Sequence, residues 1–337
     1  MYAGANVSAP PAAPTGIDRL VAGVGDGMRR VNALILERAG SDVEMIPEVA
    51  NHLISSGGKR LRPMLTLASA TMFGYAGEDH VKLATAVEFM HTATLLHDDV
   101  VDESGMRRGK PAARMIWGNQ ASVLVGDFLL GQAFKMMVEV GSLEALGVLS
   151  AAAATISEGE VRQLAGVGRI ELGEPHYFAV IEAKTAALFA AATAVGPIVA
   201  GASRWRDAMH GYGRNLGIAF QLMDDVLDFS GSTDELGKNV GDDLREGKAT
   251  LPVLVAYARG GETDRAFWRR VIGERRVLDG DVDRAADLVR RTGGLDEATR
   301  RAAGYGEAAL ADLSRTPPSE MRDILGEVVS FAIARAS

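Results

Sequence analysis

Two stretches, LLHDDVVD at residues 95–102 and QLMDDVLD at residues 221–228, determine how the whole sequence is interpreted. Each places two adjacent Asp residues and a third Asp inside an apolar run, so that the first and last Asp are four residues apart. On a helix this spacing puts both carboxylates on one face, one turn apart. Like charges at that spacing destabilise a helix, and burying them unpaired costs far more. One such run could be a solvated acidic face or a helix cap, but two copies require a common explanation.

A divalent cation explains both Asp clusters. Mg²⁺ binds carboxylate oxygens and waters, completes its octahedron with substrate phosphate, and offsets the repulsion between the carboxylates. The sequence therefore predicts two helices that face each other across a bundle and hold Mg²⁺ ions around a diphosphate. A di-iron carboxylate site is the alternative in helical proteins, but it requires Glu residues and two Glu-x-x-His pairs. Glu88 and His91 form one such pair, and no second pair is evident in the sequence.

Helical periodicity extends over most of the chain. Apolar residues recur at three- and four-residue spacing, Ala and Leu are abundant, and alternating strand patterns with hairpin turns are missing. We therefore expect an all-α fold, with one large helical domain over residues 16–337 after a disordered N-terminal arm over residues 1–15. The Arg-rich helices between Arg265 and Arg301 are expected at the surface. The best-defined helices are predicted at residues 17–38, 43–55, 60–73, 79–103, 118–139, 143–166, 176–202, 205–229 and 249–259.

The overall composition excludes several classes of function. The chain is 47% hydrophobic and 24% charged, and its formal net charge of −8 disfavours sequence-independent nucleic-acid binding, which needs a basic face. It contains no Cys, which excludes disulfides, thiolate metal sites and Cys nucleophiles and suits a reducing compartment. The N-terminus lacks the pattern of a signal peptide, so a cytoplasmic protein is expected. The apolar residues 186–202 contain Gly196 and Pro197 and are expected to form a buried helix instead of a membrane span.

Basic residues follow each Asp cluster after a short loop, at 107–110 for the first and at Lys238 and Lys248 for the second, and further cations lie at 59–62 and at Lys184. Gly57 and Gly58 adjoin three cations at a helix start, where backbone N–H groups favour an anion. Lys184 lies in a helix that is otherwise almost free of charge, where a cation needs a partner. Arg side chains grip phosphate oxygens in pairs and Lys acts as a point charge, so there are enough cations for two diphosphates. These cations are Lys59, Arg60, Arg62, Arg107, Arg108, Lys110, Lys184, Lys238 and Lys248.

Taken in order along the chain, these residues resemble the trans-isoprenyl diphosphate synthase family, specifically its long-chain polyprenyl members. The resemblance extends from about Gly57 to Pro252 and shows no departure at a catalytic position. It implies a helical bundle of the isoprenoid synthase type with a central active-site cavity, and an enzyme that condenses isopentenyl diphosphate head-to-tail with an allylic diphosphate. The matching motifs are GGKRLRP (57–63), VEFMHTATLLHDDVVDESGMRRG (87–109), KTAALF (184–189), FQLMDDVLDF (220–229) and GKNVGDDLREGKATLP (237–252).

The resemblance also implies a role for each matched residue. About three Mg²⁺ ions, for which Mn²⁺ could substitute, would be served by Asp98, Asp99, Asp102, Asp224, Asp225 and Asp228, the last mainly through water. The allylic diphosphate, such as farnesyl diphosphate, would contact Arg107, Lys184, Thr185, Gln221, Lys238 and Lys248. The diphosphate of isopentenyl diphosphate would contact Lys59, Arg62, His91 and Arg108. The residues most directly involved in catalysis would be Asp98, Asp102, Lys184, Asp224 and Lys238.

Product length would depend on the apolar tunnel beneath the first Asp cluster. Thr94 and Ala93 lie four and five residues before Asp98, about one helical turn back. Neither is aromatic, so the tunnel is not plugged there, and the resemblance implies long products of about C40–C50. The alternative is that Ala93 and Thr94 only pack within the helix. A shorter, geranylgeranyl-type synthase therefore stays open.

Two further alternatives follow from the same motifs. A terpene cyclase or a head-to-head coupling enzyme would also ionise a diphosphate with metal-binding acids, but neither needs the isopentenyl site that GGKRLRP and His91 favour. A non-catalytic subunit is disfavoured because both Asp clusters are intact. The resemblance implies a homodimer with the helices around the first Asp cluster at its interface. We also expect peripheral membrane contact for product release, and quinone side chains as the use of the product.

Overall fold

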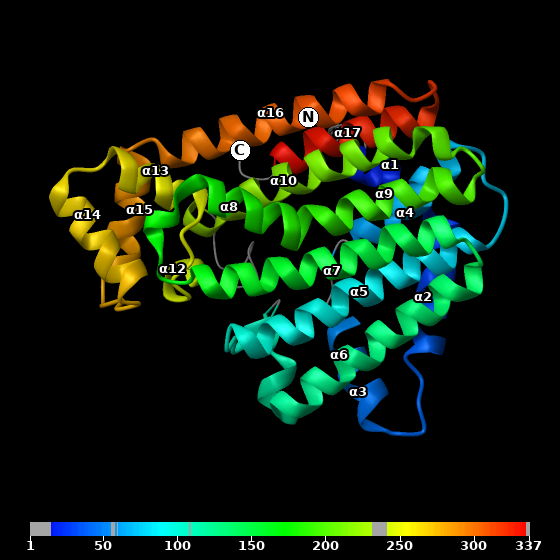
Figure 1. Cartoon of the computed structure of the whole chain (residues 1–337), viewed down its shortest axis with the longest axis horizontal. Helices are drawn as coiled ribbons and strands as arrows, with labels where there is room; N and C mark the ends of the chain where they lie inside the picture. The colour runs from blue at the N-terminus through cyan, green and yellow to red at the C-terminus, as the bar shows by residue number, and fades with distance from the viewer. Residues whose placement is uncertain (1–14, 55–57, 59, 108, 231–240, 335–337) are drawn as a thin grey trace, which may run out of the picture.

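The structure is a computed structural model that describes residues 15–54, 58, 60–107, 109–230 and 241–334. Most of these residues are helical (Figure 1), which confirms the all-α prediction. The helices of the first half are α1 (Gly16–Gly23), α2 (Gly25–Arg38), α3 (Met45–Ile54), α4 (Leu61–Met72), α5 (Asp79–Val101), α6 (Ala113–Val140) and α7 (Leu143–Gly166). Those of the second half are α8 (Gly173–Ile181), α9 (Ala187–Val199), α10 (Arg206–Ser230), α12 (Asp242–Arg245), α13 (Leu251–Arg259), α14 (Glu262–Trp268), α15 (Asp281–Arg291), α16 (Gly294–Ser314) and α17 (Glu320–Ala334).

Short elements join several of these helices. An antiparallel ladder of β1 (Met106–Arg107) and β2 (Lys110–Pro111) follows the first Asp cluster. A π-helical turn at Glu182–Ala186 connects α8 to α9 without a break in the chain direction. The other short elements are 3₁₀ turns at Ile170–Leu172 and Ser203–Trp205 and a second π-helical turn at Arg269–Gly273.

The helix α9 is central to the bundle, because it packs against α4, α5, α7 and α10. Its sequence, ALFAAATAVGPIV, is almost entirely buried, and its small Ala side chains let the neighbouring helices approach closely. Gly217 of α10 marks one such approach, since a Cβ added there would lie 2.7 Å from the Cα of Ala186. The π-helical turn before α9 is thereby held against the helix that carries the second Asp cluster.

The main hydrophobic core surrounds this central helix. Its largest fully buried side chains include Leu65 of α4, Phe89 of α5, Leu129 of α6, Phe189 of α9 and Tyr212 of α10. Full burial of an apolar side chain of this size contributes about 1.5–3 kcal/mol. The two helices that carry the Asp clusters are therefore fixed by apolar packing along their length, and the Asp residues follow at one end of each.

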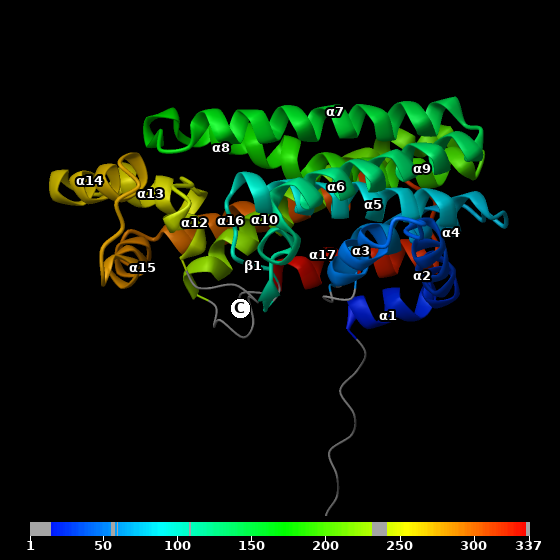
Figure 2. The same ribbon diagram turned by 90° about the horizontal axis from the view of Figure 1, so that it is seen from below.

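A second hydrophobic core joins α8 and the end of α10 to the helices of the C-terminal third. Of these helices, α13, α14 and α15 lie at one end of the molecule (Figures 1 and 2). Trp268, Val271 and Ile272 are fully buried there. The Arg-rich stretch lies at the surface as expected, because its arginines are exposed or half-buried, but its helices also bury an apolar face. The sequence of α15 shows the reason, because Leu288 and Val289 are buried while the neighbouring arginines are exposed.

The predicted helix boundaries differ from the observed ones where Gly or a π-helical turn intervenes. The helix predicted at 118–139 corresponds to the part of α6 that follows Gly118, whose φ of 85° and ψ of 168° separate it from a short helical segment over residues 113–117. The segment predicted as one helix at 176–202 consists of α8, the π-helical turn and α9. Thr15, assigned to the N-terminal arm, instead caps α1 by accepting a hydrogen bond from the Asp18 N–H. Residues 1–14 lie outside the described part of the chain.

Two segments of the described chain are long and apolar enough to cross a membrane by length and composition, at Ala113–Val140 and Ile170–Val199. Buried core helices of soluble proteins have the same composition, so the finding is weak evidence for a span. The predicted apolar stretch does form a buried helix, α9, inside the bundle. The absence of a membrane span stays a prediction.

Candidate active site

The first Asp cluster lies at the C-terminal end of α5. Asp98 and Asp99 belong to the last turn of the helix, and Asp102 caps it. Unpaired carbonyl groups give this end of a helix a partial negative charge, so cations are favoured there and carboxylates are not. The helix, which is described in full, has no basic residue in its last turn. Positive charge therefore has to come from other parts of the fold.

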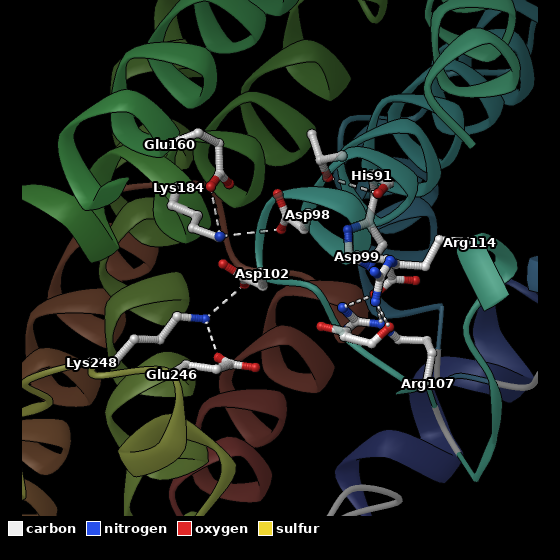
Figure 3. Close-up of polar contacts among 12 residues, drawn as sticks. His91, Asp98, Asp99, Asp102, Arg107, Arg114, Glu160, Lys184, Glu246 and Lys248 are labelled. Carbon is white, nitrogen blue, oxygen red and sulfur yellow. Dashed lines mark hydrogen bonds and ion pairs between the residues drawn. The ribbon is translucent and has the colours of Figure 1, made fainter. Parts of the chain in front are cut away.

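Two lysines from distant segments supply it (Figure 3). Lys184, in the π-helical turn before α9, places its Nζ 3.2 Å from Oδ2 of Asp98. Lys248, three residues after α12, donates from Nζ to Oδ2 of Asp102 over 2.8 Å. Single π-helical turns occur often at functional sites. The structure thus brings two of the predicted diphosphate ligands to the first Asp cluster.

The third carboxylate of the cluster, Asp99, is fully buried and pairs with Arg107 of β1. The guanidinium donates from Nε to Oδ1 of Asp99 over 2.9 Å. Burial raises the pKa of Asp99, although the charge of Arg107 acts in the opposite direction. Arg107, predicted to contact the allylic diphosphate, is directed at this buried acid in the structure, which supports a role for Asp99 in holding the loop after α5.

Each of the two lysines also contacts a Glu that the sequence analysis did not single out. Lys184 donates to Oε2 of Glu160 over 2.7 Å, and Nζ of Lys248 lies 2.6 Å from Oε2 of Glu246. Glu160 lies on α7, and no local spacing relates it to a lysine 24 residues later. Glu246 stands two residues before Lys248 within a motif already noted, so its charge was visible in the sequence.

Burial and neighbouring charges together determine the pKa values of Glu160 and of the two lysines. Burial raises the pKa of Glu160 to about 7, and the charge of Asp98 adds to the rise. Burial opposes the charge on Lys184, but its two carboxylate neighbours outweigh it and raise the pKa of the lysine. The same balance raises the pKa of Lys248. Both lysines are therefore protonated at neutral pH and can attract an anion.

The second Asp cluster lies at the end of α10 and is held by neutral groups. Tyr177 of α8 donates from its hydroxyl to Oδ2 of Asp225 over 2.6 Å. Gln221 donates from Nε2 to Oδ1 of Asp225 over 2.8 Å and accepts a hydrogen bond from Thr185 over 2.9 Å. Burial raises the pKa of Asp225 to about 8, with a further rise from the charge of Asp243. This chain of contacts fixes the orientation of the Gln221 amide.

The other two acids of the second cluster differ in exposure. Asp224 is half-buried and Asp228 is fully buried. The role predicted for Asp228, service to Mg²⁺ through water, stays a prediction. Sequence reasoning missed Tyr177, which lies seven residues before Lys184 and therefore about two helical turns back along the same helical segment.

The two clusters belong to one region of the molecule. The helix α9 packs against both α5 and α10, which carry them. Lys248 bonds to Asp102 of the first cluster, and the charge of Asp243 acts on both Lys248 and Asp225 of the second. A dianionic ligand placed near the two lysines would therefore lie within the field of both clusters.

The donor set fits a hard divalent cation that is completed by substrate. Within the described residues, no three His, Asp or Glu side chains are grouped closely enough to hold an ion by themselves. Mg²⁺ commonly binds one or two carboxylates and completes its shell with waters and phosphate oxygens. Half-buried carboxylates such as Asp98 and Asp102, with lysines at hand for the phosphate, match that requirement.

The predicted isopentenyl diphosphate residues are partly described. Arg62, in the first turn of α4, places Nη1 3.3 Å from Nε2 of His91 on α5, so the two lie together as predicted. The guanidinium of Arg62 also lies 4.4 Å from the centre of the Phe189 ring. Three predicted ligands lie outside the described residues: Lys59, Arg108 and Lys238.

The predicted chain-length residues lie one turn back from Asp98 on α5. Ala93 is buried, and Thr94 is half-buried with its hydroxyl donating to the carbonyl of His91 over 2.8 Å. Their influence on product length stays a prediction.

An open pocket of about 830 Å³, its mouth included, adjoins this region between the end of α7, α8 and the start of α13. The enclosed part of this pocket measures about 160 Å³, which is smaller than a usual pocket for a drug-sized ligand. Its walls include several residues already described, namely Tyr177, Lys184, Thr185, Gln221, Asp225, Asp243 and Lys248. Four of the residues predicted to contact the allylic diphosphate thus line a pocket that is open to solvent, namely Lys184, Thr185, Gln221 and Lys248.

Comparison with known proteins identifies the family. Residues 43–289 match the model of the polyprenyl synthetase family. The chain is 45% identical to octaprenyl diphosphate synthase of Escherichia coli, over 91% of this chain and 95% of that protein. It is 38% identical to the geranyl-diphosphate-specific all-trans-nonaprenyl-diphosphate synthase of Rhodobacter capsulatus, over 94% and 97% of the two chains.

A solved structure agrees with these relatives. The polyprenyl synthase of Caulobacter crescentus, crystallised with calcium and isoprenyl diphosphate, superposes with a TM-score of 0.93 and 49% identity, covering 97% of this chain and all of that one. The chain therefore belongs to the polyprenyl synthetase family, whose members are prenyltransferases that use a divalent metal.

Proposed function

We propose that this chain condenses isopentenyl diphosphate repeatedly with an allylic diphosphate and releases an all-trans polyprenyl diphosphate of about C40–C50. The observation that carries the proposal is the array at the end of α5, where Asp98 and Asp102 are each paired with a lysine from a distant segment. Carboxylates for a divalent cation and ammonium groups for a diphosphate are thereby held at one place.

The proposed length rests on the relatives. Identity is 45% to an octaprenyl synthase, whose product has eight five-carbon units, and 33% to the geranylgeranyl diphosphate synthase of Sulfolobus acidocaldarius. A long product also agrees with the small side chains at Ala93 and Thr94. A geranylgeranyl-type product is the second candidate, because relatives with that name cover most of the chain.

The roles of the residues follow from their charge and position. Asp98, Asp102 and Asp224 would hold Mg²⁺, about three ions in all, and the metal would stabilise negative charge on the departing diphosphate. Lys184 and Lys248 would bind the oxygens of the same diphosphate as point charges. The remaining predicted contacts are Arg107, Thr185, Gln221 and Lys238 for the allylic diphosphate, and Lys59, Arg62, His91 and Arg108 for isopentenyl diphosphate.

The reaction then requires little covalent participation by the protein. The allylic C–O bond breaks and leaves a carbocation, which the double bond of isopentenyl diphosphate attacks to form the new C–C bond. A proton leaves the carbon next to the resulting cation, and the departed diphosphate can accept it. Because the carbocation must not meet water, apolar side chains such as the buried Phe89 and the half-buried Phe220 are needed along its path.

One experiment tests both activity and length. Purified protein is incubated with farnesyl diphosphate, labelled isopentenyl diphosphate and Mg²⁺. The products are then dephosphorylated and separated by chromatography, and their masses are determined by mass spectrometry. We expect incorporation of label into products of C40–C50. A product without label would indicate a cyclase, and products ending at C20 would establish the geranylgeranyl-type alternative.

We further propose that the chain forms a homodimer through the outer face of α6. Leu124 and Val138 are 67% and 64% exposed and lie 14 residues apart, close to four full turns, so they share a face. Exposed apolar side chains gathered on one face are typical of an interaction surface. Sedimentation should show a dimer for the natural protein and a monomer for Leu124→Glu, and an unchanged dimer for that variant would contradict the proposed interface.

The remaining expectations concern the location of the protein in the cell and the use of its product. We propose a cytoplasmic enzyme that contacts the membrane surface when it releases its apolar product, which would become a quinone side chain. Fractionation of cells, together with analysis of quinone side chains after depletion of the protein, would test both statements.

A further inference from the structure

Two glutamates outside both Asp clusters occupy equivalent positions beside the two lysines. Glu160, Lys184 and Asp98 form one row of contacts, and Glu246, Lys248 and Asp102 form a second row (Figure 3). In each row the ammonium lies between a carboxylate of the first Asp cluster and a carboxylate from another segment. The Glu contact is the shorter one in both rows, at 2.7 Å against 3.2 Å and 2.6 Å against 2.8 Å.

The two rows lie largely out of water. Exposed fractions of the side chains are 20% for Lys184 and 24% for Glu160, and 21% for Lys248 and 26% for Glu246. A long lysine side chain has many rotamers, and holding it in one of them is entropically unfavourable unless fixed contacts stabilise it. Ion pairs at the surface contribute little to holding a side chain in one rotamer, whereas buried ion pairs that are also hydrogen-bonded hold both side chains in place.

The number of donors on each lysine leaves room for substrate. An ammonium group has three N–H donors. The two described carboxylate partners of each lysine take two of them, so the third can reach a diphosphate oxygen. Neither lysine would have to give up its Glu in order to bind the diphosphate.

The Asp partner, in contrast, has a second task. Asp98 and Asp102 are the carboxylates proposed to hold the divalent cation, and a carboxylate engaged with a cation is a weaker partner for a lysine. Once that exchange occurs, the Glu is the contact that still fixes the position of the ammonium. The pair of Arg107 and Asp99 is different, because Asp99 is itself fully buried and no Glu contact to Arg107 is described.

We propose that Glu160 and Glu246 are positioning residues that keep Lys184 and Lys248 directed at the allylic diphosphate while Asp98 and Asp102 turn to the metal. The proposal rests on the proposed function, since it needs those aspartates to bind the cation. In this role each Glu determines where the ammonium group of its lysine lies, and it acts on the substrate only through that lysine.

The test compares removal of each Glu with its replacement by an isosteric amide. Glu160→Gln and Glu246→Gln keep an oxygen that accepts the lysine N–H, whereas Glu160→Ala and Glu246→Ala remove it. Misplacement of a charged group by about 1 Å can lower a rate by about 100-fold. We expect each Ala variant to lower kcat by about 10- to 100-fold, with KM for isopentenyl diphosphate nearly unchanged, and each Gln variant to stay within about threefold of wild type.

A binding measurement gives a result independent of turnover. Calorimetric titration with inorganic pyrophosphate in the presence of Mg²⁺ should show about tenfold weaker binding for the Ala variants and near-wild-type binding for the Gln variants. Glu158→Ala is the matched control, because Glu158 is exposed on the same helix two residues from Glu160. It should change neither kcat nor pyrophosphate affinity.

Two outcomes would overturn the proposal. Wild-type kcat and pyrophosphate affinity in both Ala variants would mean that the lysines need no second partner. Equal losses in the Ala and Gln variants would mean that negative charge, and not position, is what the Glu supplies.

If an Ala variant fails to fold, Glu→Asp at the same position shortens the side chain by one methylene and should show the loss instead. Failure of the wild-type protein to incorporate isopentenyl units would contradict the proposed function, while the titration would still test the positioning.

Discussion

The two Asp clusters have the same sequence pattern, but their surroundings differ. At the end of α5, Asp98 and Asp102 contact lysine ammonium groups. On α10, Asp225 accepts hydrogen bonds from the neutral hydroxyl of Tyr177 and the neutral amide of Gln221. Burial raises the pKa of Asp225 to about 8, so this acid is mostly protonated at neutral pH when no metal is bound. The matching position in the first cluster is Asp99, which is also buried but pairs with the charged Arg107, so equivalent positions of one pattern meet a cation in one place and neutral donors in the other.

The largest expected effect comes from replacing one acid of each cluster by its amide. Asp98→Asn should lower kcat about 1000-fold, because a metal-binding carboxylate is lost. Asp225→Asn should lower kcat less than about tenfold, because an uncharged amide resembles the neutral acid that it replaces. Steady-state kinetics with Mg²⁺ would measure both, and circular dichroism should show unchanged helicity. Similar losses in the two variants would remove the distinction.

A smaller effect is expected when a neutral partner of the second cluster is removed. Tyr177→Phe leaves a buried oxygen of Asp225 without its donor, which should lower the free energy of unfolding by about 1–3 kcal/mol. Tyr75→Phe is the control, because Tyr75 donates to Asp79 at a less buried position. Urea unfolding would measure the free energy of unfolding of both variants. An equal or larger loss of stability in Tyr75→Phe would show that the buried hydrogen bond of Tyr177 does not contribute more than a partly exposed one.

The pH dependence of stability tests the neutral state of Asp225 directly. Its pKa is about 8 in the folded protein and near 3.8 when unfolded, so the folded state holds a proton that the unfolded state releases between these values. The contribution of this group to stability is therefore fully present below about pH 4 and is lost as the pH rises towards 8. Unfolding of metal-free protein at pH 5 and pH 7.5 should show a steeper loss for wild type than for Asp225→Asn. Parallel slopes would contradict the raised pKa.

The smallest effect on rate, but a change in product, is expected one turn behind the first cluster. Ala93→Phe should shorten the product, because an aromatic ring at this buried position would block the apolar tunnel expected beneath the first Asp cluster. Chromatography of dephosphorylated products measures the length. Ala151→Phe, at an exposed position on α7, should leave it unchanged. A product of natural length from Ala93→Phe would support the alternative that Ala93 only packs within α5.

Much of this architecture could be predicted, because helical periodicity and the Asp spacing are local properties of the chain. The sequence alone predicted the all-α fold, the two Asp helices and the gathering of distant basic residues. It did not reveal the contact between Glu160 and Lys184, since these residues are on different helices and only their packing brings them together. It also could not distinguish Asp225 from Asp99 or Asp98, because burial and partners, not spacing, determine which acids stay charged.

The fold was predicted less well where one residue changes the backbone. Gly118 interrupts α6 with a positive φ, and the periodic pattern before it was too short to indicate a helix. In the C-terminal third, frequent arginines obscured the apolar positions, so Trp268 and its buried neighbours were not assigned to a core. Amphipathic helices of this kind bury only a narrow stripe, which a high charge content conceals.

The π-helical turn at Glu182–Ala186 has a consequence for how this segment can vary. Such a turn amounts to one extra residue within an otherwise continuous helix. Deleting a single residue there would restore ordinary α-helical winding and leave α8 and α9 nearly in their present orientation, because the wider turn already absorbs the extra residue. The change would fall on Lys184, which lies within the turn and would point in a new direction, away from Asp98 and Glu160. The length of this short stretch should therefore matter for the site even though the fold around it would tolerate the deletion.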